Sequence, residues 1–141
     1  MTPPDAPVLS PLFQPALFLS RLVILRHGLV VYDQPFHTGV NIIRGTNSHG
    51  KSTIADFIFY VLGGDLSRWK PEAETCDVVI AEVLANGAIL TLKREVTAKG
   101  SQPLYIYYGS RCEEFSAVKL RRNYVVCAPK LPHVSLCFIF E

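Results

Sequence analysis

A glycine-rich segment followed by a lysine and a serine constrains this chain more than any other feature. Residues 45–53 read GTNSHGKST, so Lys51 and Ser52 directly follow Gly50, the second of two glycines that frame the segment. Glycines in such a pattern allow backbone angles at which successive N–H groups point inward and form a nest for an anion. The segment therefore predicts a phosphate-binding loop rather than an ordinary turn.

The residues on either side of the loop supply the structural context that such a loop requires. Residues 39–45, GVNIIRG, read as an almost wholly apolar strand, which we expect to be buried on both faces. Residues 51–64 carry apolar side chains at helical spacing and end in two glycines, which predicts an amphipathic helix. The apolar stripe of this helix consists of Ile54, Phe57, Ile58, Val61 and Leu62. Strand, loop and helix in this order predict nucleotide binding.

Each residue type in the loop has a predicted role in binding ATP and Mg²⁺. Lys51 would reach the β- and γ-phosphates, the Ser52 hydroxyl would hold Mg²⁺, and Thr53 would hydrogen-bond the α-phosphate. The positive end of the helix dipole adds to the attraction for phosphate, and His49 is expected to contribute its backbone rather than its side chain. The predicted nucleotide-binding residues are Gly45, Asn47, Ser48, His49, Gly50, Lys51, Ser52 and Thr53. No residue is assigned a catalytic role.

The segments around this unit predict antiparallel strands. Asn86–Gly87 separates two apolar runs and favours a two-residue type I′ turn. That turn sets the following pairs: Ala85 with Ala88, Val83 with Leu90 and Ala81 with Leu92 on an apolar face, and Glu82 with Thr91 and Ile80 with Lys93 on the other. A strand over 103–109 would extend this sheet, while strands over 21–27 and 29–33 would form a hairpin or flank a bulge at Gly28.

Composition and charge exclude several classes of protein. With 141 residues, 49% of them apolar, the chain is long enough for about one domain, and its net charge of +2 does not by itself predict nucleic-acid binding. Its four cysteines lack the spacing of a zinc site, so reduced thiols are expected. No apolar run reaches the roughly 18 residues of a membrane span, and the start of the chain does not match a signal peptide. We therefore expect a cytoplasmic protein with no membrane contact.

Two basic residues flank an aromatic residue after the predicted helix. Arg68 and Lys70 surround Trp69 in a polar connection over residues 65–75. Either this is a solvated loop with Trp69 packed on the core, or the three residues contact nucleic acid. Arg68 and Lys70 are therefore the candidates for a DNA contact.

The loop, the helix after it and the flanking hairpins together resemble a known family. Residues 36–65, FHTGVNIIRGTNSHGKSTIADFIFYVLGGD, resemble the N-terminal lobe of the Rad50/SMC/RecF class of ABC-type ATPases, and the flanking hairpins extend the resemblance over about residues 20–108. The resemblance implies an α/β fold: a partial P-loop NTPase lobe with a strand–P-loop–helix unit and an adjoining antiparallel β-subdomain. It also implies an ATPase head that forms a head-to-head dimer around ATP and acts on DNA in repair, chromosome organisation or phage defence.

The chain also departs from that class. Those ATPases continue into a coiled coil and then a C-terminal lobe with a Ser-Gly-Gly signature, a Walker B Asp-Glu pair and a switch histidine. This sequence has no heptad run, no Ser-Gly-Gly and no Asp-Glu pair after an apolar run, and Gln102 is not a convincing Q-loop residue. Without the Walker B pair, no group orients the attacking water. We expect the isolated chain to bind Mg-ATP weakly and to hydrolyse it only with a complementary C-terminal lobe.

The predicted organisation has three parts. Residues 1–18 form an irregular, proline-rich leader, residues 19–117 the N-terminal P-loop ATPase lobe, and residues 118–141 an unassigned tail that would suit a truncation. Two other functions remain open. One is a non-catalytic module that keeps the ATP contacts without turnover. The other is a different P-loop NTPase, such as a small kinase, although the hairpin after the helix argues against it.

Overall fold

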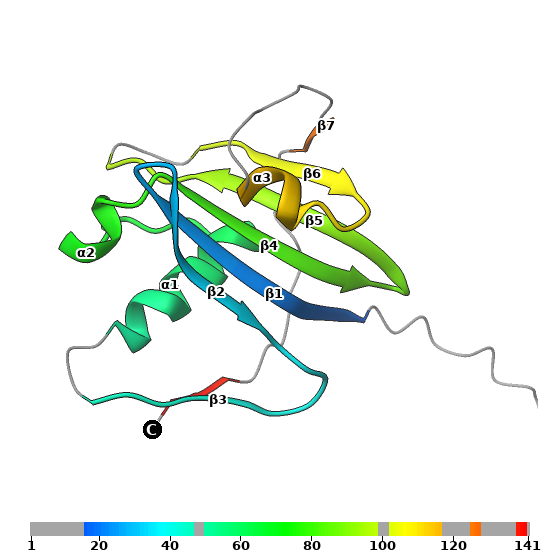
Figure 1. The fold of residues 1–141 in the computed structure, drawn as a ribbon, viewed down its shortest axis with the longest axis horizontal. Helices are drawn as coiled ribbons and strands as arrows, with labels where there is room; N and C mark the ends of the chain where they lie inside the picture. Colours follow the sequence, from blue (N-terminus) through cyan, green and yellow to red (C-terminus); the bar gives the residue numbers. More distant parts are fainter. Residues whose placement is uncertain (1–15, 47–49, 99–101, 117–124, 128–137, 141) are drawn as a thin grey trace, which may run out of the picture.

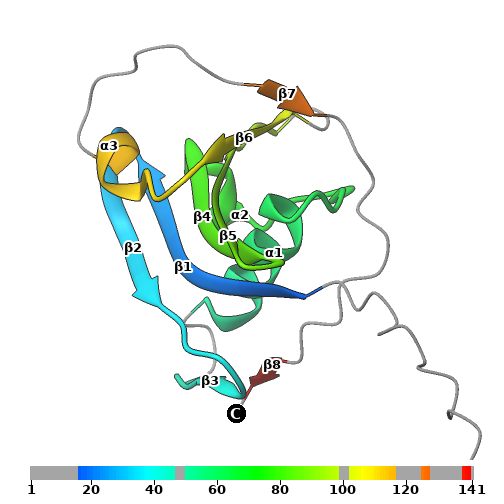
Figure 2. The same ribbon diagram turned by 90° about the vertical axis from the view of Figure 1, so that its right-hand side faces the viewer.

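The computed structural model describes residues 16–46, 50–98, 102–116, 125–127 and 138–140 (Figure 1). A six-stranded antiparallel sheet forms its centre. In the order in which neighbours pair, the strands are β2 (Leu29–Pro35), β1 (Leu17–Arg26), β4 (Val78–Ala85), β5 (Ala88–Glu95), β6 (Leu104–Tyr108) and β7 (Val125–Cys127). Helix α1 (Lys51–Val61) and helix α3 (Cys112–Ser116) lie on opposite sides of this sheet (Figure 2).

The remaining elements lie at the margins. The short helix α2 (Pro71–Glu74) falls within the connection between α1 and β4 that we expected to be polar. Strand β3 (Asn41–Ile43) pairs in parallel with β8 (Phe138–Phe140) as a separate two-stranded sheet. Strands β7 and β8 both fall in the segment 118–141 that the sequence left unassigned. In the part of the chain that the structure describes, no helix is long and apolar enough to cross a membrane.

The β4–β5 hairpin confirms the predicted register. All five predicted cross-strand pairs are observed, from Ala85 opposite Ala88 to Ile80 opposite Lys93. Asn86 and Gly87 have φ angles of 49° and 84°, the left-handed values that a type I′ turn requires at both positions. The strand predicted over 103–109 is also present, since β6 pairs with β5.

The β1–β2 hairpin contains both features that the sequence left open. Its two-residue turn has positive φ at His27 (52°) and Gly28 (73°), and the register shifts between Ile24 and Leu25, which marks a bulge. Strand β1 begins at Leu17, inside the segment 1–18 that we expected to be an irregular leader. Residues 1–15 of that leader lie outside the described residues.

Helix α1 packs on the sheet through the predicted stripe. Phe57, Ile58 and Val61 are buried in one cluster with β1, β4 and β5, and Ile54 is partly buried against it. Trp69 joins this cluster, with its ring centroid 5.0 Å from that of Phe57 and 4.8 Å from that of Tyr60. Trp69 therefore packs on the core, as the first of the two readings of this segment expected.

The other face of the hairpin is covered by a helix that the sequence did not predict. Thr91 is fully buried and Lys93 is only 8% exposed, because α3 lies over this face of the sheet. The Lys93 ammonium lies 5.3 Å from the centroid of the Phe115 ring. Burial lowers the pKa of Lys93 below its ordinary value. Thr91 and Lys93 of the hairpin are thus buried between the sheet and α3.

The strand before the loop is not buried on both faces, so that prediction is wrong for the described residues. Strand β3 is only three residues long, and Val40 and Ile42 are 56% and 48% exposed. The reason lies in the packing of the layers. Because α1 packs on the six-stranded sheet, it contributes its apolar side chains there rather than over β3.

Candidate functional site

The predicted phosphate loop joins β3 to the start of α1. The Lys51 ammonium donates a hydrogen bond to the Gly45 carbonyl, so its side chain reaches from the first residue of the helix back to the start of the loop. The structure thus brings together the first glycine and the lysine of the motif. Asn47, Ser48 and His49 lie outside the described residues, and their predicted roles stay predictions.

The start of α1 has the features of an anion site. Gly50 is the N-cap with φ 80° and ψ 11°, and no side chain of the described residues caps the helix. The first turn contains no acidic residue that would neutralise the positive end of the helix. A Cβ atom at Gly50 would meet no atom within 4 Å, so the backbone angle rather than lack of space favours glycine. Free N–H groups at a helix start and the helix dipole together favour a bound anion.

The two hydroxyl residues of the motif lie in different environments. Ser52 is exposed at the start of the helix, whereas Thr53 is buried, with 9% of its surface exposed. Among the residues that the structure describes, no three His, Cys, Asp or Glu side chains form a group that could hold a metal ion. The donor set at this end of α1 is an ammonium, a hydroxyl and the helix N-terminus. This set fits phosphate groups whose Mg²⁺ is bound mainly by phosphate oxygens and water.

The candidate DNA contacts lie on the connection that follows α1. Lys70 forms an ion pair with Asp56 of α1, with 3.1 Å between Nζ and Oδ2, and Arg68 is exposed. Trp69 between them is turned into the core. The two basic side chains therefore lie on either side of a buried residue, and no aromatic ring between them is available for stacking on a base.

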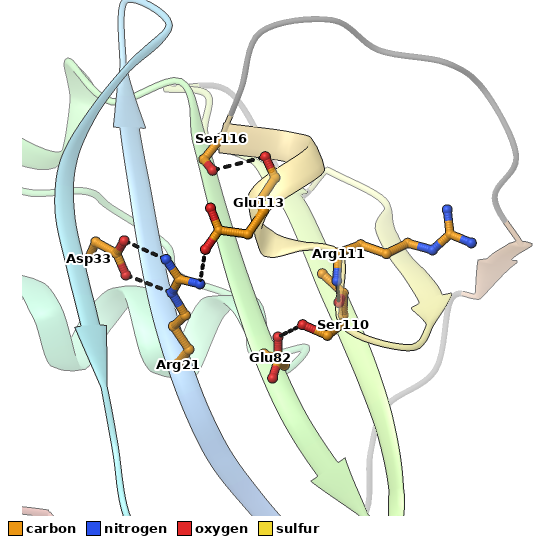
Figure 3. A network of polar contacts seen from close by, with 8 residues as sticks. Arg21, Asp33, Glu82, Ser110, Arg111, Glu113 and Ser116 are labelled. Carbon is orange, nitrogen blue, oxygen red and sulfur yellow. Dashed lines mark hydrogen bonds and ion pairs between the residues drawn. The ribbon is translucent and has the colours of Figure 1, made fainter.

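A network of charged side chains lies on the α3 side of the sheet (Figure 3). Arg21 of β1 donates to both carboxylate oxygens of Asp33 on β2, at 2.8 and 2.7 Å, and to Glu113 of α3 at 2.6 Å. The hydrogen bond from Arg21 lowers the pKa of Asp33. Asp33 thus pairs with Arg21 across the β1–β2 hairpin. The network ties α3 to the sheet and was not predicted.

One known protein family matches most of this chain. The family model AAA_23, described as an AAA domain, matches residues 34–121. The matched segment begins in β2 and includes β3, the loop, α1, the β4–β5 hairpin, β6 and α3. No curated protein matches the chain.

Proposed function

Because the chain belongs to the AAA_23 family, the N-terminal ATPase region of Rad50/SMC-like proteins, we propose that it is the ATP-binding lobe of such an ATPase. The geometry of Lys51 and of the start of α1 is the main support for this proposal. The strand–loop–helix unit holds Lys51 across the loop at Gly45, and the first turn of α1 carries no acidic side chain and no cap from a side chain that the structure describes. This arrangement suits the phosphates of a nucleotide better than a neutral ligand.

The described residues of the phosphate-binding motif have specific parts in this proposal. The Gly45 carbonyl holds the Lys51 ammonium at the loop, so the charge is already close to where the β- and γ-phosphates would bind. The exposed Ser52 hydroxyl would hold Mg²⁺, and the N–H groups of Gly50 and the first helical turn would contact the phosphates. Mg-ATP, when bound, supplies the phosphoryl group and the metal ion for hydrolysis.

Hydrolysis in this proposal requires a complementary C-terminal lobe and a head-to-head dimer. The sequence contains no Asp-Glu pair after an apolar run that could orient the attacking water. Val40 and Ile42 provide an exposed apolar surface directly before the loop, which suits a second lobe that packs beside the nucleotide. Action on DNA in repair, chromosome organisation or phage defence belongs to the same proposal, with Arg68 and Lys70 as the candidate contacts.

A calorimetric titration with Mg-ATP tests the binding site. The wild-type chain should bind, and Lys51→Ala should abolish binding while the circular dichroism spectrum and the melting temperature stay unchanged. Lys70→Ala is the matched control, because it removes a lysine that pairs with Asp56 in the middle of α1 rather than with the loop. Equal affinity in the wild type and Lys51→Ala would refute the assignment of the loop.

A steady-state ATPase assay tests the need for a second lobe. The isolated wild-type chain should show negligible turnover, against about 1–1000 per second for typical enzymes. Turnover in that range, abolished by Lys51→Ala, would show that the chain hydrolyses ATP alone and would overturn this part of the proposal.

A further inference from the structure

A buried arginine anchors the end of α1 that lies away from the phosphate loop. Arg94 of β5 is 5% exposed, and its guanidinium uses all three nitrogens. Nη1 donates to the carbonyl oxygens of Tyr60 (2.8 Å) and Gly64 (2.7 Å). Nε donates to the Gln102 carbonyl at 2.7 Å, and Nη2 pairs with the Asp65 carboxylate at 3.1 Å.

These contacts have a clear physical effect on the helix. The last carbonyl groups of an α-helix lack partners within the helix, and the C-terminal end of the helix dipole is negative. Arg94 supplies both a donor and a positive charge there, and its Cζ lies 4.0 Å from the centroid of the Tyr60 ring. The Tyr60 hydroxyl in turn donates to the Glu95 carbonyl at 2.7 Å. The C-terminal end of α1 is therefore fixed to β5 by two adjacent residues of that strand.

The glycine after the helix is also adapted to this contact. A Cβ atom at Gly64 would lie 2.4 Å from the Phe59 ring, so any larger residue here would push that exposed ring away from the chain as it folds back on α1. The fold-back places the Gly64 carbonyl where Arg94 can bind it together with the Tyr60 carbonyl. A planar guanidinium can donate in these several directions at once, whereas a lysine ammonium on a flexible stem cannot keep the same geometry.

We propose that Arg94 is a positioning residue for nucleotide binding. By fixing the C-terminal end of α1, it sets where the first turn of the helix and Lys51 lie at the opposite end. A helix of 11 residues is about 16 Å long and stiff, so a shift at one end moves the other. Arg94 therefore supports nucleotide affinity without touching the nucleotide. This inference rests on the proposed function of the loop.

The test compares nucleotide affinity between variants matched in stability. Arg94→Met removes the guanidinium that holds the end of α1. Arg94→Lys keeps the positive charge but lacks the planar group that donates in several directions. Leu104→Ala is the control, because Leu104 is buried in the same core and lies opposite Arg94 in the β5–β6 pairing. Mg-ATP affinity is measured by calorimetry at a temperature at which every variant is fully folded.

Arg94→Met should weaken Mg-ATP binding by about tenfold, since small displacements of a binding group have large effects. Arg94→Lys should recover part of that loss, and Leu104→Ala should stay within about twofold of the wild type at a similar loss of melting temperature. Wild-type affinity in a folded Arg94→Met variant would overturn the positioning role. So would an equal loss of affinity in Leu104→Ala, because a general loss of stability would then explain both.

Hydrogen exchange in the wild type tests the inference without any variant. Mg-ATP should slow exchange of the amides of residues 62–64 as well as those of the first helical turn, because the two ends are joined by a rigid helix. Slowed exchange at the first turn alone would contradict the role of Arg94. If the wild type does not bind Mg-ATP, or Lys51→Ala binds it equally well, the proposed function fails instead. If both behave as expected and the Arg94 variants bind normally, only the positioning role fails.

Discussion

Truncating Phe57 to alanine should destabilise the protein far more than the same change at Phe59, two positions further along α1. Phe57 is 2% exposed and packs on the sheet with Trp69, whose ring centroid lies 5.0 Å away. Phe59 is 54% exposed on the opposite side of the helix. The pair is a matched control within one helix, because both changes remove the same group and differ only in what that group contacts.

The magnitude follows from burial. Replacing a buried phenylalanine by alanine lowers the free energy of unfolding by about 3–5 kcal/mol, of which the ring pair with Trp69 contributes about 0.5–1.5 kcal/mol. Phe59→Ala should lower it by less than about 1 kcal/mol, as for a surface position. Because a domain of this kind is stable by only about 5–15 kcal/mol, Phe57→Ala removes a large part of its stability. Phe57→Leu, with an expected loss of about 1–2 kcal/mol, keeps the comparison possible if the alanine variant does not fold.

Urea unfolding followed by circular dichroism measures both changes. The midpoint should fall strongly for the Phe57 variants at an unchanged m-value, since the surface exposed on unfolding stays the same. An equal loss at the two positions, or a larger loss for Phe59→Ala, would show that α1 is rotated from the orientation described. The placement of Lys51 at its start would then be wrong as well.

Three further predictions concern the charges and the close contact described above. Asp33 has a lowered pKa because of its hydrogen bond from Arg21, so its contribution to stability is present above about pH 4 and is lost as the pH falls through the folded-state pKa. Urea unfolding from pH 5 to pH 2.5 should therefore show a steeper loss in the wild type than in Arg21→Met, and equal slopes would contradict the pairing. Gly64→Ala should destabilise by about 0.5–1 kcal/mol in the wild type but less in a Phe59→Ala background, and a double-mutant cycle with no coupling would contradict the close contact. Lys93→Met should change the free energy of unfolding by less than about 1 kcal/mol at neutral pH, because burial already disfavours the charged amine, and a loss of several kcal/mol in urea unfolding would contradict this.

The parts of the fold that were predictable from the sequence depend on local patterns. Asn86–Gly87 fixes a two-residue turn, and a two-residue turn fixes every pair of the β4–β5 hairpin. The stripe that includes Phe57 and Val61 identifies the buried face of α1 without knowledge of what covers it. In both cases a few neighbouring residues determine the geometry.

The parts that were not predictable depend on contacts between distant segments. Burial of β3 depends on which layers pack over it, and an apolar run such as that around Ile42 carries no information on that point. The cover over Lys93 depends on α3, which Arg21 binds through Glu113, 92 residues further along the chain. A five-residue helix is too short to show a periodic pattern of its own.

The residues of the candidate site also divide into those that a local pattern predicted and one that it did not. Gly45, Gly50 and Lys51 were recognised because the motif is contiguous in the sequence. Arg94 was missed because it acts at the other end of the helix, although a signal was present. The strand alternation places Arg94 on the same face as Leu92, and a charged residue on the buried face of a hairpin indicates a specific partner.

Hydrogen exchange at the start of α1 tests the central claim most directly. The claim is that the phosphates of ATP bind at the helix start next to Lys51. Addition of Mg-ATP should slow exchange of the amides of residues 50–54 in the wild type and leave them unchanged in Lys51→Ala. If ATP binds and these amides exchange as before, or if Lys51→Ala shows the same protection, the nucleotide does not bind at this loop.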